Sequence, residues 1–161
     1  MLRSFLIGLV AGQRGIAPLA SIAIATRRNE LRPTQPFQKL FLSQLVTAAV
    51  TAFAGAEMVG DKMKSAPDRI VPVGLLVRSI TAAYAGAALA PKQERPRAAV
   101  LAVGTALVSS YIGWRIRCAS MRRYGQTATG LVEDAIVFAS GLAIANPRLV
   151  AAKTAKVRAR R

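Results

Sequence analysis

Six ionisable residues lie inside, or at the ends of, long apolar stretches of this sequence. A charge in an apolar stretch is costly to bury unless it meets an opposite charge or faces a water-filled cavity. The six could therefore line a polar cavity that binds an ion, a proton or an anionic head group, or they could form ion pairs that only orient the elements carrying them. The sequence leaves both alternatives open for Arg14, Glu57, Asp61, Arg78, Glu133 and Asp134.

The remaining residue types restrict the chemistry. The chain has no His, so a proton relay would need Glu57, Glu133 or Asp134 with a raised pKa. Cys118 is the single cysteine, so Cys and His cannot form a metal site, and we expect neither a metal nor a cofactor. There is no P-loop, and residues 8–15 are not a dinucleotide fingerprint because no βαβ unit surrounds them. The sequence favours a non-enzymatic role without deciding it. A membrane enzyme with two carboxylates as acid and base is a third, weaker hypothesis.

Five apolar runs carry these residues, and 53% of the chain is apolar while only 6% is aromatic. A membrane-spanning helix needs about 17–25 residues, and regular alternation typical of strands is absent. We predict an all-α, polytopic membrane bundle of about five segments in residues 1–147, followed by a basic tail in 148–161. The predicted segments are 4–26, 40–60, 70–90, 98–114 and 128–145.

The first run is irregular. It contains three glycines, then Pro18, with polar Gln13 and Arg14 between them. Proline removes one helical hydrogen bond and glycine weakens a helix. The run therefore predicts either a kinked span or a broken, re-entrant segment that lines a cavity.

Basic residues are concentrated between the runs, and the net charge is +16. This placement favours membrane boundaries over nucleic acid binding. Five spans would divide the connecting cations eight to thirteen, which predicts a cytoplasmic C-terminus and an outer N-terminus. A re-entrant first run would move Arg3 to the cytoplasmic side and change the division to fourteen against seven. In the tail, the residues expected to contact anionic lipid head groups are Arg148, Lys153, Lys156, Arg158, Arg160 and Arg161.

Alternating spans predict the depth of the charges. Glu57, near the end of the second run, and Arg78, early in the third, fall in the outer half of the bilayer together with Glu133 and Asp134. We therefore expect Arg78 to pair with Glu57 or Asp134, with Arg14 close enough to join them.

Small residues recur at a spacing of four in three of the runs. Such spacing produces a flat face on which another helix can approach closely. The partner helix could belong to the same chain, to a second copy or to a partner membrane complex. The predicted packing residues are Ala48, Ala52, Ala56, Gly60, Ala82, Gly86, Ala135, Ala139 and Ala143.

Taken together, these motifs resemble a family of small bacterial integral membrane proteins classed as a domain of unknown function. The resemblance covers most of the chain up to about Ala145, and the sequence departs from the family pattern at Lys64 and Asp68. It implies a multi-span protein of the bacterial inner membrane and supplies no activity. The matching positions are Gly8, Gly12, Arg14, Pro18, Glu57, Asp61, Lys62, Pro67, Arg69, Pro72, Gly74, Arg78, Ala82, Gly86, Arg115, Arg117, Glu133 and Asp134.

Two main hypotheses follow. A small transporter or channel-like protein would have a water-filled cavity that reaches the acidic residues. A structural or assembly membrane protein that binds anionic lipid or a partner complex would instead have mutually satisfied charges.

Overall fold

The computed structural model describes residues 1–31, 33–60 and 71–146. Seven α-helices and one 3-10 turn make up this part of the chain, which contains no strand, so the all-α prediction is confirmed. Asp61 and the basic tail 148–161 lie outside the described residues. The elements are α1 Leu2–Gln13, α2 Ala17–Arg27, α3 Gln38–Leu42, α4 Gln44–Gly60, α5 Pro72–Ala88, the 3-10 turn Lys92–Glu94, α6 Arg95–Tyr124 and α7 Gln126–Ala145.

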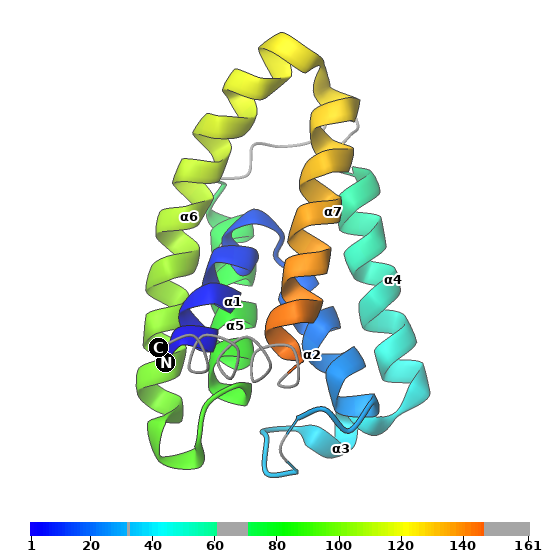
Figure 1. The fold of residues 1–161 in the computed structure, drawn as a ribbon, viewed down its shortest axis with the longest axis vertical. Helices are drawn as coiled ribbons and strands as arrows, with labels where there is room; N and C mark the ends of the chain where they lie inside the picture. Colours follow the sequence, from blue (N-terminus) through cyan, green and yellow to red (C-terminus); the bar gives the residue numbers. More distant parts are fainter. Residues whose placement is uncertain (32, 61–70, 147–161) are drawn as a thin grey trace, which may run out of the picture.

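The first apolar run forms a helical hairpin. Helix α1 ends at Gln13, and the next residue, Arg14, has an extended backbone. The chain then turns back so that α2 descends beside α1 (Figure 1). Pro18 lies in the first turn of α2, where backbone N–H groups have no helical partner, so the missing N–H of proline costs no hydrogen bond. Pro18 therefore starts a helix here, and of the two alternatives for this run the structure has the broken one, a helical hairpin.

The prediction of five membrane-spanning segments is wrong in number. By length and composition, two apolar helices of the described part could cross a membrane, Lys92–Tyr124, which includes α6, and Gln126–Ala145. The hairpin divides the first run into helices of 12 and 11 residues, and α4 and α5 have 17 residues each. At about 1.5 Å per residue, neither arm of the hairpin reaches across a bilayer core of about 30 Å.

Helix α6 extends beyond the fourth predicted run. Residues 115–124, which the sequence analysis placed in a connection, continue the helix to Tyr124. Gly125 then adopts φ +80°, a conformation that glycine adopts without steric cost, and α7 begins at the next residue. Helices α6 and α7 thus meet at an apex beyond the other helices (Figure 1).

Small residues pack α1 against α6. A Cβ atom added to Gly8 would lie 2.5 Å from the carbonyl oxygen of Ala102, and one added to Gly12 would lie 2.5 Å from that of Ala106. Because these neighbours are backbone atoms, neither position accepts a side chain without a shift of a helix. Helices α1 and α5 both pack on a stripe of buried small residues on α6, which was not predicted from the sequence. The stripe consists of Ala98, Ala102, Ala106 and Ser110.

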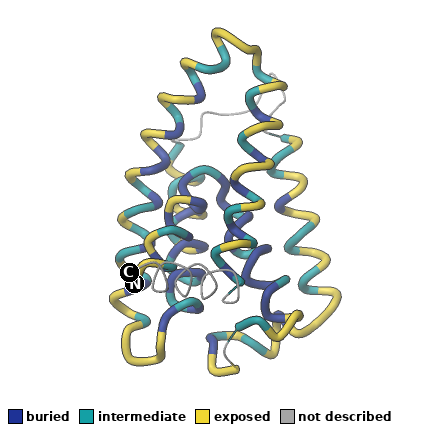
Figure 2. The backbone as a smooth tube through the Cα atoms, in the orientation of Figure 1, coloured by how far each residue is buried: buried dark blue, intermediate teal, exposed yellow. Residues whose placement is uncertain are grey.

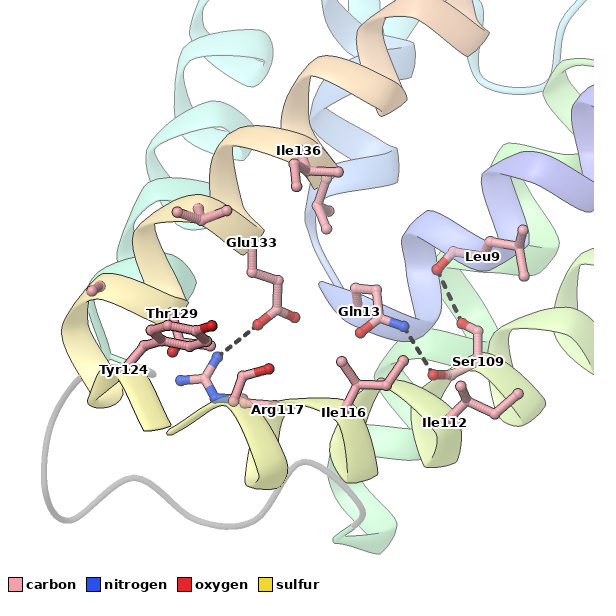
Figure 3. A pocket seen from close by; sticks show the side chains of 15 residues that line it. Leu9, Gln13, Ser109, Ile112, Ile116, Arg117, Tyr124, Thr129, Glu133 and Ile136 are labelled. Carbon is pink, nitrogen blue, oxygen red and sulfur yellow. Dashed lines mark hydrogen bonds and ion pairs between the residues drawn. The ribbon is translucent and has the colours of Figure 1, made fainter. Parts of the chain in front are cut away.

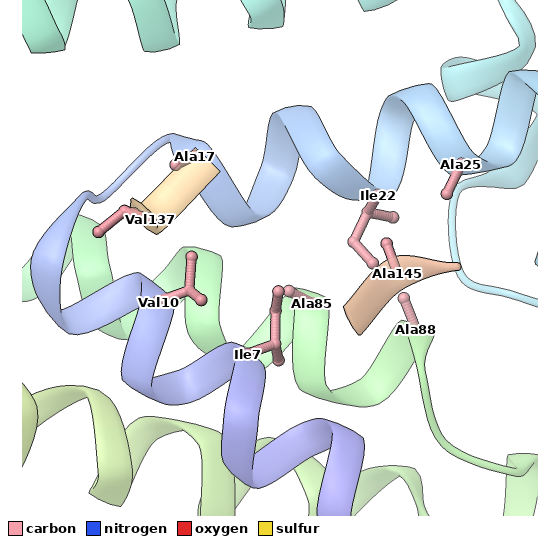
Figure 4. Close-up of a cluster of buried hydrophobic side chains, with 9 residues drawn as sticks. All are labelled: Ile7, Val10, Ala17, Ile22, Ala25, Ala85, Ala88, Val137 and Ala145. Carbon is pink, nitrogen blue, oxygen red and sulfur yellow. The ribbon is translucent and has the colours of Figure 1, made fainter. Parts of the chain in front are cut away.

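A second cluster joins the hairpin to α5 and α7 (Figure 4). Ile7 and Val10 of α1 face Ile22 of α2, with Ala85 of α5 and Val137 of α7 packed around them. Figure 2 shows that burial is concentrated in the hairpin, whereas α4 and the apex are largely exposed. The hairpin is therefore the centre of the fold rather than a peripheral segment.

The three predicted packing faces have different surroundings. Ala82 and Gly86 of α5 are buried, and a Cβ atom on Gly86 would lie 2.5 Å from that of Ala102 on α6. The alanines of the other two faces are exposed within this chain, and the fourth residue of the α4 face, Gly60, is half-buried. The exposed alanines are Ala48, Ala52 and Ala56 on α4, and Ala135, Ala139 and Ala143 on α7.

Candidate functional site

Arg14 is buried at the turn of the hairpin and pairs with Asp134. Its side chain is 1% exposed. Its Nε donates a hydrogen bond to Asp134 Oδ1 at 2.7 Å, and its Nη2 lies 2.6 Å from the same oxygen. The sequence analysis expected Arg78 to be the partner of Asp134 or Glu57, with Arg14 close by. The structure shows Arg14 bonded to Asp134 directly, which ties the end of α1 to α7.

Glu57 binds the backbone of the same turn. The carboxylate, which projects from α4, accepts hydrogen bonds from the N–H of Gly15 at 2.7 Å and of Ile16 at 2.9 Å. These groups precede the first turn of α2, where N–H groups lack helical partners and the helix dipole favours a negative charge. Glu57 therefore acts as a cap supplied by a helix 41 residues further along the chain.

Arg78 of α5 lies beside this turn. It is 6% exposed, and a Cβ atom on Gly15 would lie 3.4 Å both from Arg78 Cγ and from Glu57 Oε1. The side chains of Arg78 and Glu57 therefore both lie in van der Waals range of the turn at Gly15. Four of the six predicted charged residues, each from a different helix or helix end, therefore surround one backbone turn.

Glu133 belongs to a separate pair. Its Oε2 accepts a hydrogen bond from Nη1 of Arg117 at 3.1 Å, and this contact joins α7 to α6. Glu133 and Asp134 are neighbours in sequence, but they project towards different partners. Arg117 was not among the predicted site residues, because the sequence analysis assigned residues 115–125 to a connection outside the bundle.

Polar residues of α1 and α6 also join the two helices near the turn. Gln13 Nε2 donates to the carbonyl oxygen of Ser109 at 2.9 Å, and Ser109 Oγ donates to that of Leu9 at 3.0 Å. Ser110 Oγ donates to the carbonyl oxygen of Gly12 at 3.1 Å. Sequence reasoning missed both serines. Their positions three and four residues beyond Ala106, on the same face as the alanine stripe of α6, are the signal that could have identified them.

An open groove of about 800 Å³ lies between α6 and α7, with α1 at its inner end (Figure 3). Its walls are mainly apolar. The Arg117–Glu133 pair crosses it on one side, and Gln13 lies at the hairpin end (Figure 3). This groove was not predicted from the sequence, because it forms only when α6 continues to Tyr124. The apolar wall residues are Leu9, Ile112, Ile116, Val132, Ile136 and Val137.

The arrangement constrains the chemistry of the acids. Asp134 is ion-paired and buried, and Glu57 accepts two backbone hydrogen bonds. Glu133 is ion-paired and lines the groove. Among the described residues, no three His, Cys, Asp or Glu side chains are grouped so that they could hold a metal ion.

Around the hairpin turn, then, the charges contact groups of the protein itself, and the groove beside it offers an apolar surface with one ion pair. The resemblance to a family of small bacterial membrane proteins stays a prediction. Comparisons with protein-family models, curated proteins and solved structures find no match for this chain.

Proposed function

We propose that this chain is an integral membrane protein with a structural or assembly role, in which the buried charges hold a re-entrant hairpin in place. One observation carries this proposal. The acidic residues of the described core contact groups of the protein itself, through Arg14–Asp134, Arg117–Glu133 and the two backbone bonds of Glu57. The structural hypothesis predicts that charges in an apolar bundle are bound by other groups of the protein in this way.

The physical need for these charges comes from the hairpin. Lipid cannot satisfy free backbone N–H groups, so a turn inside the hydrocarbon region is stable only when protein groups bind it. Glu57 supplies two acceptors to the turn. Arg14, which would be costly to bury alone, is neutralised by Asp134 from α7.

The hairpin also bears on orientation. Met1 and the end of α7 lie at the same end of the molecule, and Arg3 donates hydrogen bonds to the carbonyl oxygens of Ile144 and Ala145 (Figure 1). With a re-entrant first run, and with the 17-residue helices α4 and α5 crossing the membrane beside α6 and α7, the cations divide fourteen to seven. This division supports a cytoplasmic position for both ends of the bundle, in a bacterial inner membrane.

Two kinds of partner fit this role. The basic tail 148–161 would bind anionic lipid head groups at the cytoplasmic surface. The exposed alanine faces of α4 and α7 would accept helices of a partner membrane complex or of a second copy.

One observation favours transport as a second candidate function. The ends of α1 and α2 meet within the bundle, and transporters use such broken helices to bind substrates or ions. In this alternative, Glu57 and Asp134 would exchange their protein partners for an ion or a proton.

Reconstitution separates the two functions. Purified protein is placed in liposomes, and proton and potassium flux are recorded together with unfolding in detergent for wild type, Asp134→Asn and the exchanged pair Arg14→Asp with Asp134→Arg. The structural role predicts no flux above that of protein-free liposomes, lower stability for Asp134→Asn, and partial recovery in the exchanged pair. Wild-type flux that Asp134→Asn abolishes at unchanged stability would establish transport instead. Glu94→Gln, at an exposed acid in the 3-10 turn, is the control.

A further inference from the structure

The groove between α6 and α7 differs from the hairpin turn in its surface. Several of its large apolar side chains are exposed, among them Ile112, Ile116, Val132 and Ile136. Isolated exposed apolar residues are ordinary, but these four line one groove, and Figure 3 shows three of them, Ile112, Ile116 and Ile136. A volume of about 800 Å³ falls within the range of about 300–1,000 Å³ that ligand sites occupy.

The length of the groove fits a lipid tail. Its lining on α6 runs from Ser109 to Tyr124, which corresponds to about 22 Å along a helix. One leaflet of the hydrocarbon core is about 15 Å thick, half of the usual core thickness. A single acyl chain that enters near the apex would therefore fit within the groove, whose hairpin end is lined by Leu9 and Gln13.

The apex end of the groove is positively charged. Arg122 and Arg123 are exposed in the last turn of α6, and the Arg123 guanidinium lies 5.5 Å from the ring centroid of Tyr124, which lines the groove. The first turn of α7 begins at the same place and contains no acidic residue. The nearest acid in α7 is Glu133, which Arg117 already neutralises. This end of the groove is therefore complementary to an anionic group.

We infer that the groove between α6 and α7 binds an anionic phospholipid, with one acyl chain along Ile116 and Ile136 and the phosphate at Arg123. The occupant must be apolar over most of its length and negative at one end, and an anionic phospholipid has this chemistry. The Arg117–Glu133 pair joins α6 to α7 and sets the width of the groove between them. This inference rests on the membrane location proposed above, but it needs neither the structural role nor transport.

The test counts retained lipid. Full-length protein in detergent is incubated with equal concentrations of phosphatidylglycerol or phosphatidylcholine, and native mass spectrometry records the fraction that carries one lipid. We expect phosphatidylglycerol to be retained in preference, and Arg123→Gln to weaken its retention about fivefold, the effect of one cation near an anionic head group. Arg97→Gln makes the same charge change at an exposed position at the opposite end of α6, and should leave retention unchanged.

A second pair of variants tests the groove itself. Ile136→Trp fills the groove and should abolish retention of both lipids, whereas Val108→Trp, at an exposed position on α6 outside the groove, should not. If Ile136→Trp does not fold, Val132→Trp replaces another exposed wall residue and serves the same purpose.

Three results would overturn the inference. Equal retention of the two lipids by wild type would show that the groove has no preference for an anionic head group. Equal losses in Arg123→Gln and Arg97→Gln would show that lipid is attracted by the net charge alone. A dimer that Ile136→Trp dissociates, with no lipid retained by wild type, would show that the groove holds a helix of a second copy. Release of the protein from membranes by alkaline carbonate would instead refute the membrane location, so the two failures are distinguishable.

Discussion

Helices α1 and α4 both carry small residues at a spacing of four, yet their surroundings differ. Gly8 and Gly12 of α1 press against the backbone of α6, and α5 and α7 cover the other sides of the helix. Ala52 and Ala56 of α4 are exposed, and α4 packs mainly on α2 and α3. Ala54 is the single fully buried residue of α4.

The difference shows that a small-residue stripe and a packed interface are separate properties. On α1 the stripe permits a close approach that glycine alone allows. On α4 the residues that reach the core lie off the alanine stripe. Ala54 is buried, Met58 packs against the core cluster, and Glu57 binds the hairpin turn. We therefore expect α1 to be sensitive to added volume, and α4 to be sensitive chiefly at Glu57.

The largest effect should come from the buried charge at the end of α1. Asp134→Ala removes the carboxylate that pairs with the buried Arg14 and should lower the free energy of unfolding by about 3–5 kcal/mol. SDS titration in detergent micelles measures the change. The double variant Arg14→Met with Asp134→Leu should recover most of the loss. A loss below 1 kcal/mol in the single variant would contradict the burial of this pair.

Added volume on α1 should have the next largest effect. Gly12→Ala places a methyl group against the carbonyl oxygen of Ala106 and should cost about 1–3 kcal/mol in the same titration. Gly104→Ala on α6 is the matched control, because its added Cβ would meet no atom within 4 Å and should cost nothing. Similar results for both variants would show that the close contact between α1 and α6 is absent.

A smaller effect is expected where α4 reaches the hairpin. Glu57→Gln keeps one acceptor oxygen but replaces the other by an NH2 group, which cannot accept from a backbone N–H. One of the bonds to Gly15 and Ile16 is therefore lost together with the charge, and stability should fall by about 1 kcal/mol. Hydrogen exchange of these two amides should become faster while that of α6 stays unchanged. Unaltered exchange at both amides would contradict the capping role of Glu57.

The smallest effect should come from the exposed face of α4. Ala52→Leu adds volume to the stripe without meeting another part of the chain, and unfolding should change by less than about 0.5 kcal/mol. Light scattering of the same samples records the oligomeric state. A large loss of stability, or a change in mass, would show that another helix covers this face in the native protein, and the contrast with α1 would then disappear.

Part of the fold followed from sequence because its signals are local. Long apolar runs without alternation predicted an all-α chain, and the proline and glycines of residues 4–26 indicated a break. The number of spans was wrong for two reasons. The irregular first run accommodates either a kink or a complete reversal, and the helices formed by the second and third runs are only 17 residues long. The end of α6 was also misplaced, since clustered arginines are typical of a membrane boundary but are compatible with a continuing helix.

The candidate site divides in the same way. Charge in an apolar stretch identified Arg14, Glu57, Arg78 and Asp134, because burying a charge is costly wherever it occurs. Their partners depended on which helices are neighbours. Arg117 was missed for the same reason, because its role depends on α7 lying beside the extended part of α6.

The sequence by itself determined that the chain is helical, apolar, basic and interrupted in its first run, because these properties depend on composition and on neighbouring residues. The tertiary structure decided that the interruption reverses the chain, that Glu57 caps it, and that the stripe of α1 is buried while that of α4 is exposed. Each of these outcomes needs groups far apart in sequence to meet, and spacing along a helix does not say which helix will face it.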